Sequence, residues 1–127
     1  MTAVLEHANI TVSDVHKTAR WMADVFGWRV RWEGASIHGG YSLHIGGKDS
    51  YLALYTPLEI KSDAGDTYST RAGLNHLAVT VDDLDATEER VKAAGFSTNS
   101  HADYEPGRRF YFDDNDGIEF EIVSYSS

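Results

Sequence analysis

Hydrophobic and polar residues alternate in two stretches of the chain that closely resemble each other. Residues 5–12 read Leu-Glu-His-Ala-Asn-Ile-Thr-Val, and residues 74–81 read Leu-Asn-His-Leu-Ala-Val-Thr-Val. Short segments rich in β-branched residues, with apolar side chains at alternate positions, are typical of strands that bury one face. Because an internal repeat sets the architecture of a whole fold, the match predicts two copies of one structural unit.

A helical pattern follows each of these strands. Apolar or small residues recur at spacings of three and four in both segments, at Val15, Ala19, Met22 and Phe26 and then at Leu84, Thr87, Val91 and Ala94. Asp14 precedes the first segment and Asp82 or Asp83 the second, where an aspartate accepts hydrogen bonds from the free amides of the first turn. Gly27 and Gly95 suit the left-handed residue that ends a helix. They lie 20 and 19 residues after the repeated histidine, so the copies match in length.

Three further strands are expected after each helix. They cover residues 28–33, 41–45 and 51–55 in the first copy and residues 96–99, 109–113 and 118–123 in the second. The sequence therefore predicts an α+β fold of two βαβββ modules within a single domain, residues 1–127. The modules are residues 4–57 and 73–125, and residues 58–72 form a polar linker. A helix on one face of each mixed sheet leaves a concave face, and two such faces are expected to form a cleft for a small molecule.

The composition narrows the range of partners. Lys and Arg number 11 against 20 Asp and Glu, which gives a net charge of -9. An acidic protein repels phosphate backbones and anionic membranes, so we expect no nucleic-acid or membrane partner. The chain has no cysteine, which excludes disulfides, thiolate ligands and a cysteine nucleophile. It has neither a secretion signal at its start nor a long apolar run, so a cytoplasmic location is expected.

Strand parity brings three metal-ligating side chains to the concave faces. In the last strand Phe120 and Ile122 suit the helix-packed face, which turns Glu121 the other way. The same alternation turns His76 and His7 away from the helices. A lone strand histidine is more often structural, but two histidines and a carboxylate at matching repeat positions predict one divalent metal site.

The paired units, the histidine in each first strand and the closing Asp-x-Asp-Gly-x-x-x-Glu resemble the vicinal oxygen chelate superfamily, from Leu5 to Val123. That group includes glyoxalase I, extradiol dioxygenases, fosfomycin-resistance enzymes and bleomycin-binding proteins. The resemblance implies metal ligands at His7, His76 and Glu121, and a homodimer. The fourth ligand position falls on Ala53, unlike the carboxylate expected of a glyoxalase I. Two histidines and one carboxylate with open positions favour Fe(II) or Mn(II), with Zn(II) or Ni(II) as alternatives.

Two residues are catalytic candidates. Tyr111 lies ten residues before Glu121, in a pattern that resembles the Tyr-x-x-Asp-x-x-Gly-x-x-x-Glu of extradiol dioxygenases. The resemblance implies that Tyr111 hydrogen-bonds a substrate oxygen, although an ordinary strand aromatic fits as well. His101 resembles the upstream histidine of that pattern, at a spacing about one residue too long.

Four further residues are candidate substrate contacts. Asn9, Tyr51 and Tyr55 share the inward parity of the first copy, and core packing explains the tyrosines nearly as well. Arg109 could clamp an anionic group, although such arginines more often solvate a strand end. The remaining histidines, His16, His38 and His44, are expected to be structural or exposed.

Two classes of function fit these features. The first is a divalent-metal-dependent enzyme acting on a small molecule, with an oxygenase-like reaction on a catechol-like, metal-chelating substrate favoured over a glyoxalase-like lyase or isomerase or a thiol transferase. The second is a metal-free protein that sequesters a cationic drug such as bleomycin. The acidic balance and the inward aromatic residues fit the second class, whereas the three ligands favour the first.

Overall fold

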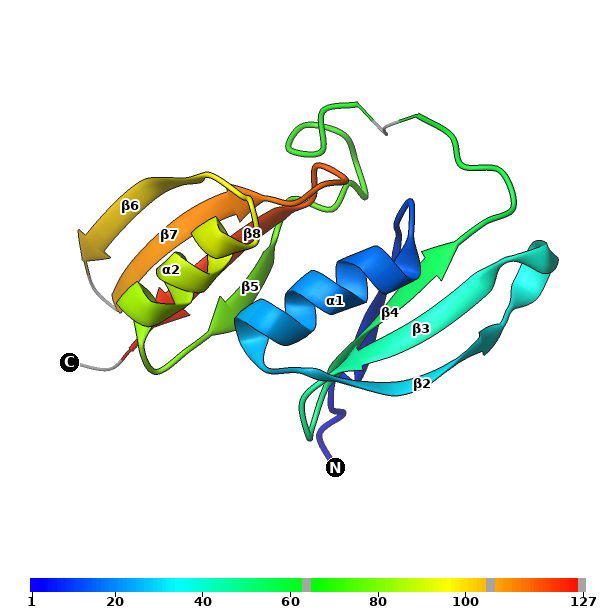
Figure 1. Cartoon of the computed structure of the whole chain (residues 1–127), viewed down its shortest axis with the longest axis horizontal. Helices are drawn as coiled ribbons and strands as arrows, with labels where there is room; N and C mark the ends of the chain where they lie inside the picture. Colours follow the sequence, from blue (N-terminus) through cyan, green and yellow to red (C-terminus); the bar gives the residue numbers. More distant parts are fainter. Residues whose placement is uncertain (63–64, 105–106, 126–127) are drawn as a thin grey trace. The chain divides into compact units, whose positions relative to one another are not determined.

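Figure 1 shows the computed structural model of the chain, in which residues 1–62, 65–104 and 107–125 are described. The chain divides into two compact units, Met1–Lys61 and Ser62–Ser127. Each unit is built on a four-stranded mixed sheet and an α-helix. The α+β class and the duplicated unit predicted from the sequence are therefore confirmed.

Unit 1 follows the predicted order of elements. They are β1 (His7–Thr11), α1 (Val15–Phe26), β2 (Arg29–Ala35), the short 3₁₀ turn η1 (Ile37–Gly39), β3 (Tyr41–Gly46) and β4 (Tyr51–Thr56). The strands lie in the order β1-β4-β3-β2, with β1 parallel to β4 and the other pairs antiparallel. The first strand thus lies beside the last, which places the repeated histidine next to β4.

Unit 2 repeats this arrangement. Its elements are β5 (Leu77–Thr80), α2 (Leu84–Ala93), β6 (Thr98–Tyr104), β7 (Gly107–Asp113) and β8 (Glu119–Ser124). The strand order is β5-β8-β7-β6, and β5 is parallel to β8. His76 is the residue immediately before the first residue of β5.

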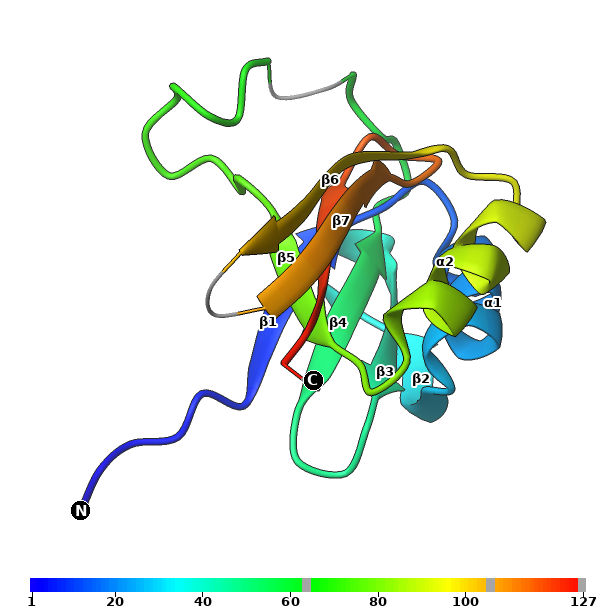
Figure 2. The same cartoon turned by 90° about the vertical axis from the view of Figure 1, so that its left-hand side faces the viewer.

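Each helix lies along one face of its own sheet (Figures 1 and 2). In unit 2 the helix buries Leu84, Thr87 and Val91. The sheet meets them with a face that holds the fully buried side chains Phe110, Phe112, Phe120 and Ile122. Alternation along β7 and β8 then sends Arg109, Tyr111, Glu119 and Glu121 to the opposite face. Packing of the apolar face therefore fixes which side chains are left for chemistry.

The helix ends largely follow the local signals. The Asp14 carboxylate accepts hydrogen bonds from the amides of His16 and Lys17, and Asp83, one of the two residues considered, accepts from Ala86. Gly27 is left-handed at φ 72°. Ala94, which was expected on the buried helix face, is exposed because α2 ends at Ala93.

The strand predicted at residues 96–99 differs most from the structure, because β6 instead covers Thr98–Tyr104. Asn99 pairs with Tyr111 and Ala102 with Arg109, so two residues of β6 stand opposite one residue of β7. Ser100 takes a positive φ of 55° at this β-bulge. The bulge reverses the facing of the residues that follow.

Neither helix in the described parts of the chain has the length and hydropathy to cross a membrane.

Candidate functional site

Unit 2 brings His76 and Glu121 into contact. The parallel pairing of β5 with β8 sets Ala78 beside Glu121, so His76, two residues earlier, reaches the same face. Nε2 of His76 lies 3.1 Å from Oε1 of Glu121, and the Glu121 side chain is only 10% exposed. Two of the three predicted ligands are therefore adjacent, and the carboxylate is largely removed from water.

The second nitrogen of His76 also has a neighbour. Nδ1 lies 2.7 Å from Oδ1 of Asn75, an oxygen that only accepts hydrogen bonds. When Nδ1 donates to this oxygen, the neutral ring presents the lone pair of Nε2 to the Glu121 carboxylate, whereas the other tautomer donates from Nε2 to Oε1. A ring nitrogen lone pair beside a carboxylate oxygen is a pair of donors that suits a divalent ion.

His7 in unit 1 is oriented in the same way. Its Nδ1 lies 2.9 Å from Oε1 of Glu6, and the ring stacks on Tyr51 at 4.8 Å and 13°. The Tyr51 hydroxyl also donates to Oε1 of Glu6, and these two hydrogen bonds lower the pKa of the Glu6 carboxyl. In both copies of the repeat, the side chain before the histidine lies within hydrogen-bonding distance of Nδ1, as the outer partners of metal-binding histidines do.

The predicted ligand set combines two residues of unit 2 with one of unit 1. Among the described residues, no group of three or more His, Asp or Glu side chains is close enough to hold a metal ion. The pair His76 and Glu121 is thus observed, whereas a site that includes His7 stays a prediction.

Arg109 contacts Glu121. Its Nη1 donates to Oε2 of Glu121 at 2.7 Å, and the two side chains are 12% and 10% exposed. A second guanidinium nitrogen, Nη2, donates to the carbonyl of Gly107 at 3.3 Å. These contacts pair the guanidinium with a carboxylate of the protein itself. The role of Arg109 as a substrate clamp stays a prediction.

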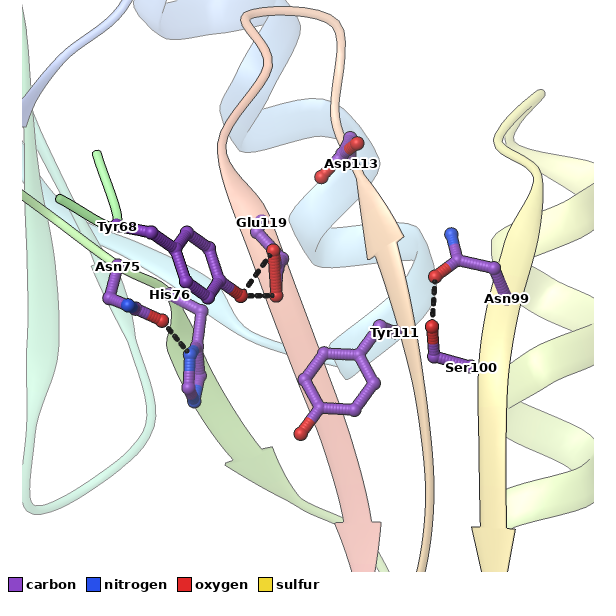
Figure 3. A pocket seen from close by; sticks show the side chains of 8 residues that line it. All are labelled: Tyr68, Asn75, His76, Asn99, Ser100, Tyr111, Asp113 and Glu119. Atoms are coloured by element: carbon purple, nitrogen blue, oxygen red, sulfur yellow. Dashed lines mark hydrogen bonds between the residues drawn. The ribbon is translucent and has the colours of Figure 1, made fainter. Parts of the chain in front are cut away.

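A pocket of about 360 Å³ opens beside His76 on the same face (Figure 3). Its lining residues are Tyr68, Asn75, His76, Asn99, Ser100, Tyr111, Asp113 and Glu119. Tyr111 stands directly opposite Glu121 in the β7–β8 pairing, and its ring meets that of His76 edge-on at 5.9 Å. The structure thus gathers Tyr111 with two of the predicted ligands.

Tyr68 is a pocket residue that the sequence did not single out. Its hydroxyl donates to both oxygens of Glu119, at 2.7 Å and 2.5 Å. This hydrogen bond, together with partial burial and nearby negative charge, raises the pKa of Tyr68 to about 12. The preceding turn is held by Asp66, which accepts hydrogen bonds from the Tyr68 amide and the Ser69 hydroxyl. An Asp followed by Ser/Thr residues inside the linker was the available signal for an ordered turn.

His101 lies toward the helix rather than beside Tyr111. Its Nε2 is 2.6 Å from Oε2 of Glu88 on α2, and its ring lies 6.0 Å from Phe110 of the helix-packed face. The bulge at Ser100 is the cause, because one extra residue exchanges the faces of the side chains after it. The two catalytic candidates therefore lie on different faces of the sheet.

The corresponding face of unit 1 is aromatic. Tyr51 stacks on His44 at 4.7 Å as well as on His7, and Trp32 lies 5.1 Å from His44. The guanidinium of Arg31 sits 4.5 Å above the Tyr51 ring. Burial, followed by the charges of His7 and Arg31, lowers the pKa of His44. His44 was expected from the sequence to be structural or exposed; its position between the apolar Leu43 and Ile45, which are both buried, was the signal that it lies on this face.

The other two candidates of unit 1 differ in their surroundings. Asn9 is exposed and pairs with Ala53 in the sheet. The Tyr55 hydroxyl donates to the Ile37 carbonyl at 2.9 Å, which ties its ring to the 3₁₀ turn. Their roles as substrate contacts stay predictions.

Comparison with protein families and solved structures gives the family. The model of the Glyoxalase/Bleomycin resistance protein/Dioxygenase superfamily matches residues 4–122. The chain belongs to this superfamily. The resemblance drawn from the two repeated histidines and the closing glutamate motif is thereby confirmed. No curated protein gives a significant sequence match.

Solved structures of this superfamily share the fold. A glyoxylase/bleomycin resistance protein/dioxygenase domain from Frankia sp. EAN1pec has a TM-score of 0.81 at 24% identity, over 98% of this chain and 92% of that one. The fosfomycin resistance protein FosX from Mesorhizobium loti gives 0.69 at 25% identity, over 98% and 93%. A mutant FosX from Listeria monocytogenes, complexed with Mn(II) and 1S,2S-dihydroxypropylphosphonic acid, gives 0.73 at 22% identity, over 100% and 93%.

Proposed function

We propose that the chain is a divalent-metal-dependent enzyme that acts on an oxygen-bearing small molecule, with His7, His76 and Glu121 as the metal ligands. One observation carries the proposal. Nε2 of His76 lies 3.1 Å from Oε1 of Glu121, and Nδ1 of the ring lies 2.7 Å from Oδ1 of Asn75, so the tautomer that donates from Nδ1 turns the Nε2 lone pair toward the carboxylate. His7 has the same arrangement with Glu6. This donor set of two imidazoles and one carboxylate suits Mn(II) or Fe(II), and the Listeria relative was solved with Mn(II).

A divalent ion at these ligands supplies a Lewis acid that binds substrate oxygens and stabilises negative charge on them. The chain's own residues supply the surroundings. Glu121 is largely buried and Arg109 holds its second oxygen, so the carboxylate keeps one orientation. The Tyr111 hydroxyl lies in the same pocket as His76, where it donates to a substrate oxygen that becomes negatively charged.

Within this class we favour an oxygenase-like reaction on a catechol-like substrate. The spacing of Tyr111 and Glu121 supports it, and so does the pocket wall, in which the Tyr68, His76 and Tyr111 rings offer surfaces for a flat molecule. Arg109 is paired with Glu121, and no Lys or Arg is among the described residues that line the pocket. This surface is therefore poorly suited to a phosphonate such as the one bound by the Listeria protein.

Metal binding is the first test. The full chain, purified without chelator, is assayed for bound metal and for its melting temperature with Mn(II), Ni(II), Zn(II) or, without oxygen, Fe(II). We expect about one ion per chain and a higher melting temperature. His76→Ala and Glu121→Gln should weaken binding by about tenfold or more. His16→Ala, which removes an exposed helix histidine bonded to Glu33, serves as the matched control. No bound metal and no rise in melting temperature would refute the proposal.

The reaction is tested next with a panel of catechols. The Fe(II)-loaded chain is mixed with each compound under oxygen, and coloured ring-cleavage products are followed by absorbance. Product that depends on both Fe(II) and Tyr111 supports the oxygenase reading. Metal binding without product leaves the lyase, isomerase and transferase reactions, which are tested with their own substrates.

The second candidate function is metal-free sequestration of a cationic drug. The half-exposed Trp32 beside His44 and the net charge of -9 favour it. Tight binding of bleomycin to the metal-free chain, read by quenching of tryptophan fluorescence and lost in Trp32→Ala, would support this candidate over the enzyme.

A further inference from the structure

The two oxygens of the Glu121 carboxylate have different neighbours. Oε2 accepts a hydrogen bond from Nη1 of Arg109 at 2.7 Å, whereas Oε1 faces Nε2 of His76 at 3.1 Å. Both side chains of the ion pair are nearly buried, at 12% and 10% exposed. A charge-assisted hydrogen bond in such surroundings is stronger than one in water and holds the carboxylate in one orientation.

This geometry decides how Glu121 can bind a cation. A carboxylate ligand contributes either one oxygen or both. Because Arg109 occupies Oε2, only Oε1 is directed toward His76. We propose that Arg109 is a positioning residue that keeps Glu121 a single-oxygen ligand and whose positive charge lowers the affinity of the site for metal. This inference rests on the proposed function, because it takes Glu121 to be a ligand.

The repeat supplies an internal comparison. Tyr111 pairs with Glu121 and Arg109 with Val123 in unit 2, and the corresponding pairs in unit 1 are His44 with Ala53 and Ser42 with Tyr55. The copy that has an alanine in place of the glutamate thus has a serine in place of the arginine. A cation accompanies the carboxylate, as expected if Arg109 serves Glu121.

The neighbouring arginine provides a matched control. Arg108 faces the other side of β7 and donates to Asp85 at 3.0 Å, in an exposed pair at the start of α2. Removing it deletes the same charge from the same strand without touching Glu121. A general effect of net charge on metal binding would therefore appear in Arg108 and Arg109 variants alike.

The test compares Arg109→Met, Arg109→Gln and Arg108→Met in the full chain with Mn(II) alone. Free Mn(II) is measured by electron paramagnetic resonance, and water bound to the protein-held ion by the relaxation rate of solvent protons. Arg109→Met removes the positive charge and exposes Oε2, so Mn(II) should bind about tenfold or more tightly. Proton relaxation should slow because the second oxygen replaces a water. Arg108→Met should match the wild type in both measurements.

Arg109→Gln separates charge from geometry. Its shorter, neutral side chain removes the charge but keeps an N–H donor near Oε2, so binding should tighten while the relaxation rate stays closer to that of the wild type than in Arg109→Met. If Arg109→Met does not fold, the Mn(II) affinity of Arg109→Gln tests the effect of the Arg109 charge. Equal or weaker Mn(II) binding by the folded Arg109 variants would overturn the role of Arg109 while leaving the proposed function intact. A wild-type chain that binds no Mn(II) would overturn both.

Discussion

The buried carboxyl of Asp114 should make the stability of this protein fall between about pH 4 and pH 7. Asp114 opens the β7–β8 turn, where its Oδ1 accepts hydrogen bonds from the amides of Asp116 and Ile118 at 2.8 Å and 3.0 Å. Its Oδ2 is buried without a hydrogen-bond partner among the described residues. Burial raises the pKa of Asp114 from 3.8 to about 6, and the two amide hydrogen bonds oppose that rise only in part.

The sign follows from which state holds the proton. Between pH 3.8 and about 6 the folded chain keeps a proton on Asp114 that the unfolded chain has lost, so raising the pH costs stability. A difference of about 2 pH units corresponds to about 3 kcal/mol, fully present below pH 4 and lost above pH 6. Asp114→Asn has no charge to bury and should be free of this loss.

The measurement is the difference in unfolding free energy between Asp114→Asn and the wild type, from urea titrations followed by circular dichroism at several pH values. Taking the difference cancels the other titrating groups. From pH 4 to pH 7.5 it should move toward the variant by about 3 kcal/mol. In Asp114→Asn the side-chain NH2 group takes the place of Oδ2 and has no hydrogen-bond acceptor there. This lowers the variant's stability by about 1–3 kcal/mol at every pH and leaves the pH dependence of the difference unchanged. A difference that stays constant with pH would show that Asp114 titrates alike in both states.

Two further predictions concern side chains near the pocket. Tyr68→Phe removes the hydrogen bond to Glu119 and should remove one phenol that ionises near pH 12 from the alkaline absorbance titration. An unchanged titration would contradict the assignment. His101→Gln should leave Mn(II) affinity as in the wild type, because His101 contacts Glu88 on the helix side, and a loss of about tenfold or more would place this residue at the metal instead.

Local signals predicted the elements of the fold well. Asp14 and Asp83 cap their helices, and the alternation of Phe120, Glu121 and Ile122 sorts the faces of β8, because capping and strand parity depend only on neighbouring residues. The bulge at Ser100 could not be predicted in this way, since a serine at positive φ is uncommon and no sequence pattern marks it. That single residue moved His101 to the other face.

Contacts between segments distant in the sequence were harder to foresee. Tyr68 reaches Glu119 from a linker whose path depends on the Asp66 turn, and residues 58–72 gave no periodicity to follow. Alternation along β7 and β8 puts Arg109 on the face of Glu121, but strand parity gives the face of a residue and not its partner on the neighbouring strand. The ion pair of Arg109 with Glu121 was therefore not predicted, and its role as a substrate contact stays a prediction.

The two copies of the repeat share the contact at Nδ1 of the histidine and differ in the residues around that ring. Glu6 and Asn75 hold Nδ1 of their histidines in the same way, so each sheet presents one Nε2. Around that nitrogen, unit 1 offers rings and Ala53, whereas unit 2 offers Glu121 with its arginine. Under the proposed function, Glu121 supplies the negative charge at the metal. Ala53 has no side-chain atom that can serve as a fourth ligand. A second carboxylate at Ala53 would fill an open position and add a negative charge for which unit 1 has Ser42 where unit 2 has Arg109. The asymmetry therefore concerns the balancing charge as much as the ligand itself.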